Sequence, residues 1–172
     1  MTLTYPTHLA LQDSGLLLDL SSAGLLEPAL QLSCTYCTTD LRFHSLDREI
    51  RAELEPHIQS GSLLVFNCVE DDWLTIKELV KSNSRLSSEE WSVYNLARTN
   101  DWPILVGCAC LYGWVYIPPM QRFNLTWLVN ELLRQAKISK PAALRGVAKI
   151  SSVNPRLRVE CASLTKTVEA DW

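Results

Sequence analysis

Hydrophobic positions along the chain form short unbroken runs, separated by longer segments in which apolar and polar residues alternate with a helical period. The runs are GLLLDL (15–20), CTYCTT (34–39), SLLVFNCV (62–69) and PILVGC (103–108). Apolar runs of this length, bounded by polar segments, are typical of parallel strands that are buried on both faces. We therefore predict a strand in each of the four runs.

The segments between these runs predict helices with recognisable ends. SSAGLLEPALQL begins at a serine cap, and DLRFHSLDREIRAELEPHIQSG indicates one or two helices that end at Gly61. Further helices are expected in DDWLTIKELVKSN, SSEEWSVYNLARTN, NLTWLVNELLRQAK and SKPAALRGVAKISS. The alternation predicts an α/β fold, a three-layer sandwich with a central parallel sheet of four or five strands and helices on both faces.

The composition fits one domain. The chain has 172 residues, a formal net charge of −3 at pH 7 and 47% hydrophobic residues, which is ordinary for a globular protein. Because we find no internal repeat, low-complexity tract or linker, we expect a single domain over residues 1–172. The start lacks a basic region followed by an apolar stretch, and no apolar run approaches the roughly 18 residues of a membrane span. We expect a cytoplasmic protein with no membrane contact.

Two residues at the predicted strand ends bear on chemistry. Asp19 would end the first strand and Cys108 the fourth, and open α/β sheets bind ligands beyond the carboxyl ends of their strands. A buried carboxylate is costly unless it is paired, hydrogen-bonded or bound to a metal. Two interpretations of Asp19 stay open: a functional acid, or an acid that caps a helix or accepts backbone hydrogen bonds.

Four stretches of the chain resemble PIN domains, the nuclease fold of VapC-type toxins, in their order and spacing. They are LLLDLSSAGLL, TTDLRFHSL, RLSSEEWSVYNLARTNDWPILVGCACLY and TWLVNELLRQAKISKPAALRGVAKISSVNPRLRVE, and the similarity covers residues 14–160. The resemblance implies a PIN-like domain and an endoribonuclease that cuts RNA with Mg²⁺ or Mn²⁺ held by carboxylates. These ions take hard oxygen ligands and orient a water for attack on phosphate.

The resemblance also implies which residues would hold the metal, and two of the four acids are missing. The first acid of the family falls on Asp19, and the acid that opens the helix before LARTN falls on Glu90. The family Glu falls on Ser45, and the Asp after the fourth strand falls on Cys108. We expect these four residues to converge in one cleft. Metal binding through Asp19 and Glu90 should be weak, because a thiol is a poor ligand for Mg²⁺.

The remaining acids near these positions also have structural interpretations. Ser87 and Glu90 stand at the S-x-x-E spacing of a capping box, in which Glu90 bonds the backbone of its own cap. Asp47 and Glu49 lie within one helical turn of Ser45, where they would either reach the site or face solvent. Asp40 is expected to cap the helix after the second strand.

The cysteines permit a different kind of site. Cys34 and Cys37 form a C-x-x-C pair and Cys108 and Cys110 a C-x-C pair, which together supply the four thiolates of a structural zinc site. Residues three apart on a strand point to opposite faces, however, so the first pair suits a turn better than this predicted strand. We expect reduced, mostly buried thiols, with zinc binding or a redox role as alternatives.

Aromatic and basic residues suggest partners. Trp114 and Tyr116 follow Cys108 and would stack RNA bases or face a protein, although core packing also explains aromatic residues. A basic cluster on the C-terminal helical pair is usually a solvated face but could follow a phosphate backbone. It comprises Arg134, Lys137, Lys140, Arg145 and Lys149.

Three hypotheses of function follow. The favoured one is a catalytically impaired PIN-like module that binds or regulates a protein, either an antitoxin-like partner or a second copy, and needs no cofactor. The second is an active Mg²⁺- or Mn²⁺-dependent endoribonuclease that uses Asp19, Glu90 and a further acid. The third is a zinc- or thiol-dependent module built on the two cysteine pairs.

Overall fold

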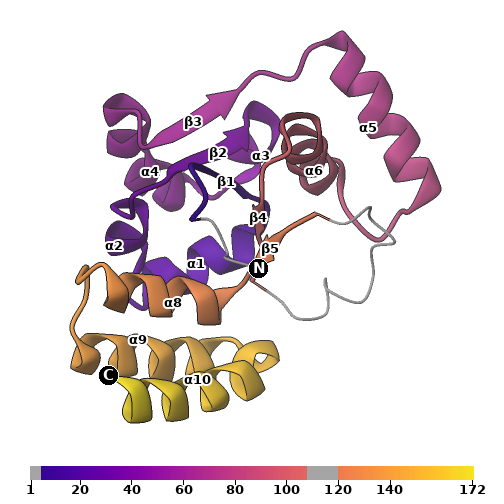
Figure 1. The fold of residues 1–172 in the computed structure, drawn as a ribbon. Helices are drawn as coiled ribbons and strands as arrows, with labels where there is room; N and C mark the ends of the chain where they lie inside the picture. Colours follow the sequence, from indigo (N-terminus) through magenta and orange to yellow (C-terminus); the bar gives the residue numbers. More distant parts are fainter. Residues whose placement is uncertain (1–4, 108–119) are drawn as a thin grey trace. The chain divides into compact units, whose positions relative to one another are not determined.

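The computed structural model describes residues 5–107 and 120–172 and contains a five-stranded parallel sheet (Figure 1). The strand order is β3-β2-β1-β4-β5. The strands are β1 (His8–Leu11), β2 (Thr35–Thr39), β3 (Leu63–Phe66), β4 (Ile104–Leu105) and β5 (Arg122–Phe123). In the register Ala10 lies beside Cys37 and Ile104, and Thr39 lies beside Phe66.

Helices alternate with the strands along the chain. They are α1 (Ser14–Ser22), α2 (Leu26–Leu30), α3 (Asp40–Ser45), α4 (Arg48–Ser60), α5 (Glu70–Ser82), α6 (Ser88–Asn100), α8 (Leu125–Arg134), α9 (Lys140–Val153) and α10 (Arg158–Asp171), with a short 3₁₀ turn at Pro155–Leu157. The α/β class and the parallel sheet are confirmed, and the arrangement is consistent with a three-layer sandwich.

The predicted first strand is wrong. GLLLDL lies in helix α1, and the first strand is the preceding HLAL of β1. A short apolar run has no periodicity that separates a strand from a buried helix, so the flanking residues decide. Here Asp13 is the N-cap, and its carboxylate accepts hydrogen bonds from the backbone N–H groups of Gly15 and Leu16.

Several predicted helix ends are confirmed. Gly61 ends α4 in the left-handed conformation, at φ 79°, which favours glycine. Ser87 caps α6, and the capping box with Glu90 is present. Helix α9 overlaps the predicted segment, and Ser139, which was not predicted as a cap, accepts from the backbone N–H of Ala142. Besides β1, the two-residue strand β5 and helix α10 were not predicted from the sequence.

The chain forms two compact units. The first consists of the described residues within Met1–Gln12, Ser33–Leu105 and Pro118–Arg122, and the second of those within Asp13–Leu32, Val106–Ile117 and Phe123–Trp172. The fully buried side chains of the first unit include Leu9, Tyr36, Leu63 and Ile76, and those of the second include Leu20, Leu128 and Ile150. None of the described helices is both long and apolar enough to cross a membrane.

Candidate functional site

The residues implied by the PIN resemblance lie on different elements. Asp19 is in α1 of the second unit, not at a strand end, whereas Ser45 ends α3 and Glu90 lies in the first turn of α6, both in the first unit. Cys108 lies outside the described residues, as do Cys110, Trp114 and Tyr116. The expected convergence of the four positions therefore stays a prediction.

Asp19 is a buried acid held by a hydrogen bond within its own unit. Its Oδ2 accepts from Asn154 Nδ2 at 2.7 Å, and Asn154 Oδ1 accepts from the backbone N–H of Arg156 at 3.1 Å. Burial raises the pKa of the Asp19 carboxyl, the bond from Asn154 lowers it, and the charge of Asp13 raises it, with a net increase. The bond ties α1 to the turn between α9 and α10, so Asp19 has a structural role.

Glu90 and Ser45 are likewise engaged in local hydrogen bonds. Glu90 Oε2 accepts from the backbone N–H of Ser87 at 2.7 Å, and its Oε1 lies 4.0 Å from Nη2 of the buried Arg42. The Ser45 hydroxyl donates to the carbonyl of Arg42 at 2.7 Å. Two acids near Ser45, Asp47 and Glu49, are exposed. The capping interpretation of Glu90 is thus confirmed.

The acid that directly follows the first strand is Asp13, which the sequence analysis missed. Its Oδ1 accepts from the N–H groups of Gly15 and Leu16 at 2.8 and 3.3 Å, and its Oδ2 accepts from the N–H of Gly107 at 3.2 Å. Gly107 has to be small, because a Cβ there would lie 2.6 Å from Leu16 Cβ and 2.9 Å from Asp13 Oδ2. The D-S-G sequence, an Asp cap before an apolar run, was the available signal.

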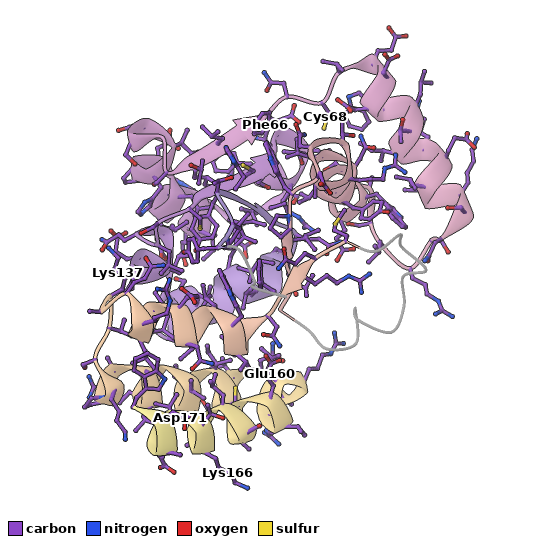
Figure 2. The ribbon with its side chains drawn as sticks, in the orientation of Figure 1. Phe66, Cys68, Lys137, Glu160, Lys166 and Asp171 are labelled. Carbon is purple, nitrogen blue, oxygen red and sulfur yellow. The ribbon has the colours of Figure 1, made fainter. Side chains whose placement is uncertain are left out.

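A cavity of about 190 Å³, lined by both polar and apolar residues, opens at the carboxyl ends of β2 and β3, within the first unit. Thr39 and Phe66 are the last residues of these strands, Asn67 and Cys68 follow β3, and Asp72 comes from the first turn of α5. One side of α6 completes the lining. Figure 2 labels Phe66 and Cys68, which lie where β3 leads into α5. This is the end of the sheet at which α/β proteins bind ligands.

The buried hydroxyl groups of the cavity are saturated with hydrogen bonds. Ser92 Oγ donates to the carbonyl of Glu89 at 2.7 Å and lies 2.6 Å from Thr39 Oγ1, which accepts from the N–H of Arg42 at 3.1 Å. With its own proton directed to Glu89, Ser92 is the acceptor of the Thr39 proton. These two hydroxyls hold β2 against α6 and have no proton left to donate to a ligand.

Two carboxylates surround the Cys68 thiol beside this cavity. Asp40 Oδ1 accepts from the N–H groups of Leu41 and Cys68 at 2.8 and 3.0 Å. Burial acts to raise the pKa of Asp40, but the bonds from Cys68 and Leu41 and the charge of His44 hold it below the ordinary value. Burial, a hydrogen bond to Asp40 and the charges of Asp40 and Asp72 raise the pKa of the Cys68 thiol to about 12. The thiol is therefore protonated at neutral pH.

The other described cysteines are buried thiols. Cys34, Cys37 and Cys161 are at most 9% exposed, and burial raises the pKa of Cys37 to about 12 and of Cys161 to about 11. The expectation of buried thiols is confirmed for these three residues. Within residues 5–107 and 120–172, no group of three or more His, Cys, Asp or Glu side chains has an arrangement that could hold a metal ion.

The basic cluster on the C-terminal helices is partly committed to internal contacts. Arg134 pairs with Glu131 at 2.7 Å, and Lys140 Nζ donates to the carbonyl of Glu169 at 2.8 Å. Lys137, Arg145 and Lys149 are exposed.

Comparison of the chain with protein-family models, curated proteins and solved structures gives no match. The α/β class with its parallel sheet is shown by the structure itself.

Proposed function

We propose that this chain is a PIN-like domain whose metal-ribonuclease site has eroded and that it acts as a binding or regulatory module for another protein. The hydrogen bonds of the two surviving candidate acids carry this proposal. The carboxylate of Asp19 accepts from Asn154, and that of Glu90 accepts from the backbone of Ser87, each at 2.7 Å. Both carboxylates have a structural role without a metal, because the Asp19 bond joins α1 to the residue that ends α9 and the Glu90 bond completes the cap of α6.

An exposed apolar surface on α5 supports a protein partner. Val69, Trp73 and Leu74 are 61%, 39% and 57% exposed and lie together at the start of this helix. Exposed aromatic and aliphatic side chains of this kind are enriched at protein interfaces. The neighbouring Glu70 and Asp71 are also exposed. The surface suits an antitoxin-like partner or a second copy of the chain better than RNA, whose phosphates these acids would repel.

The test of the eroded site is to restore its charge. The double variant Cys108→Asp with Ser45→Glu adds two carboxylates at the positions where the family has acids, so we expect it to bind Mn²⁺ at least tenfold more tightly than the unaltered chain. The change is measured by titration with Mn²⁺ and by divalent-dependent cleavage of a mixed RNA pool. Cys108→Ala alone is the matched control and should change neither.

Cleavage of RNA by the unaltered chain would instead support the second hypothesis, an active endoribonuclease. Robust cleavage by the unaltered chain, abolished in either Asp13→Asn or Asp19→Asn, would identify an active Mg²⁺- or Mn²⁺-dependent endoribonuclease. Both variants are needed because Asp13 follows the first strand whereas Asp19 carries the sequence resemblance. They also control for contaminating nuclease, whose activity neither substitution would affect.

A further inference from the structure

The cavity at the ends of β2 and β3 has the electrostatic character of a site for a cation. The Asp72 carboxylate receives hydrogen bonds from two uncharged donors, the N–H of Val69 at 3.0 Å and Asn95 Nδ2 at 3.0 Å. Within residues 5–107 and 120–172 neither Asp40 nor Asp72 forms an ion pair. The guanidinium of Arg98 bonds the residue next to Asp72 in this network, because its Nη2 donates to Asn95 Oδ1 rather than to the Asp72 carboxylate.

The carboxyl end of α6 adds to this negative potential. Leu96, Thr99 and Asn100, from the last turns of the helix, line the cavity. The C-terminus of a helix carries a partial negative charge and favours cations. Asp72 also lines the cavity, and together with the exposed Glu70 and Asp71 it places negative charge in the first turn of α5, where it offsets the positive N-terminus of that helix. Both helices therefore present the cavity with groups that attract a positive charge.

The remaining lining suits an ammonium group on a short alkyl chain. Asn100 Nδ2 donates to the carbonyl of Leu96 at 2.8 Å, which leaves its Oδ1 as an acceptor, and the hydroxyl of Thr99, another lining residue, is a further acceptor. Phe66 and Leu96 form an apolar part of the cavity wall. An aromatic ring such as that of Phe66 also attracts a cation placed over its face. A cavity of about 150 Å³ accommodates a six-membered ring of carbon atoms. About six non-hydrogen atoms therefore fit here.

We propose that this cavity binds a small alkylammonium ligand, with the ammonium group bonded to Asp72 and Asn100 and the alkyl chain packed against Phe66 and Leu96. The site shares no residue with the positions implied by the PIN resemblance, so it holds whether or not the proposed function does. The ammonium donates three hydrogen bonds, and the carboxylate, amide and hydroxyl oxygens of this cavity can accept them.

The test compares 1,4-diaminobutane with 1,4-butanediol, which has the same number of non-hydrogen atoms but no charge. We expect the diamine to bind the unaltered chain at least about tenfold more tightly than the diol by calorimetry, since hydrogen bonds to a charged group are the stronger ones. Butylamine, with one ammonium group, should retain most of the affinity of the diamine. Equal binding of diamine and diol, or no binding of the diamine at millimolar concentration, would overturn the proposal.

Variants locate the ligand within the molecule. Asp72→Asn should weaken diamine binding about tenfold or more, whereas Asp71→Asn, which makes the same charge change in the same turn outside the cavity, should weaken it less than about threefold. Asn100→Leu removes the second proposed contact to the ammonium group and leaves unchanged the residues that cap α5. Unchanged affinity in both Asp72→Asn and Asn100→Leu would contradict the assignment.

Discussion

At the scale of single residues, polar side chains at the element ends are explained by the hydrogen bonds that they complete. Asp13 bonds two N–H groups of α1 and one of Gly107, and Asp19 bonds the amide of Asn154. A buried acid was expected to need a partner, and Asp19 has one, but that partner is the side chain of Asn154 rather than the helix cap or backbone groups that were predicted. The identity of that partner, 135 residues further along the chain, has no local signal in the sequence.

The buried carboxyl of Asp19 should make the free energy of unfolding depend on pH. Because burial raises its pKa in the folded chain, the folded state binds the Asp19 proton more tightly than the unfolded state does. Its contribution to the free energy of unfolding is therefore favourable at low pH and decreases as pH rises from the ordinary carboxyl pKa through the raised value. Asp19→Asn removes this titration and keeps an oxygen that can accept from Asn154.

Urea denaturation of both proteins at a series of acidic pH values measures the difference. The free energy of unfolding of Asp19→Asn, minus that of the unaltered chain, should increase with pH across this window and then level off. All other carboxyl groups are common to both proteins and cancel. A difference that decreases with pH would mean that the pKa of Asp19 is lowered by folding.

At the scale of elements, helix ends were predicted better than short strands. Gly61 and the Ser87–Glu90 box follow from backbone conformation and hydrogen bonding within a few residues, which local sequence specifies. Strand β5 has two residues and depends on its neighbour β4, so local sequence gives no sign of it. Helix α10 did have a signal, because Cys161, Leu164 and Val168 recur at helical spacing and all three are buried.

The capping box of α6 should contribute measurably to stability. Ser87→Ala removes the acceptor for the N–H of Glu90, now bonded at 3.2 Å, so we expect the free energy of unfolding to fall by about 1 kcal/mol. Chemical denaturation measures this loss. Ser84→Ala, at an exposed turn position three residues earlier, is the matched control and should change the stability by less than about 0.5 kcal/mol.

At the scale of the whole molecule, the α/β class and the parallel sheet could be predicted, whereas the cavity at the ends of β2 and β3 could not. Strand and helix patterns are properties of short segments, but the cavity unites residues of β2, β3, α5 and α6. Its most informative residue, Asp72, is one of three consecutive acids in the sequence, and nothing local separates it from Glu70 and Asp71. In the second unit, Glu160 of α10, which is labelled in Figure 2, joins two helices that are far apart in the sequence, because it accepts from the N–H and hydroxyl of Thr126 in α8, both at 3.1 Å.

The thiols of the folded chain should react slowly. With pKa values of about 12 for Cys37 and Cys68 and about 11 for Cys161, their thiolate fractions at pH 8 are lower than those of unfolded thiols by on the order of a hundredfold or more. Alkylation with iodoacetamide, followed by peptide mapping, should label these three residues only after denaturation. Rapid labelling of Cys37 or Cys161 in the native protein would contradict their burial.

Elemental analysis of protein purified without added metal addresses the remaining cysteine hypothesis. We expect less than one tenth of an equivalent of zinc per chain, roughly the level of adventitious metal, because tight structural sites retain a full equivalent. One tightly held equivalent would favour a zinc module built on Cys34, Cys37, Cys108 and Cys110, two of which lie outside the described residues.

The close approach of Gly107 to Leu16 couples the evolution of two positions that are far apart in the sequence. Because a Cβ at 107 would lie 2.6 Å from Leu16 Cβ, an alanine at 107 forces the start of α1 to move, at a cost of about 1–3 kcal/mol. A substitution history that replaces this glycine should therefore pass first through glycine at 16, the one residue without a Cβ. In a library randomised at both codons and selected for folding, residues larger than glycine at 107 should be recovered with glycine at 16, and alanine at 16 should not rescue them.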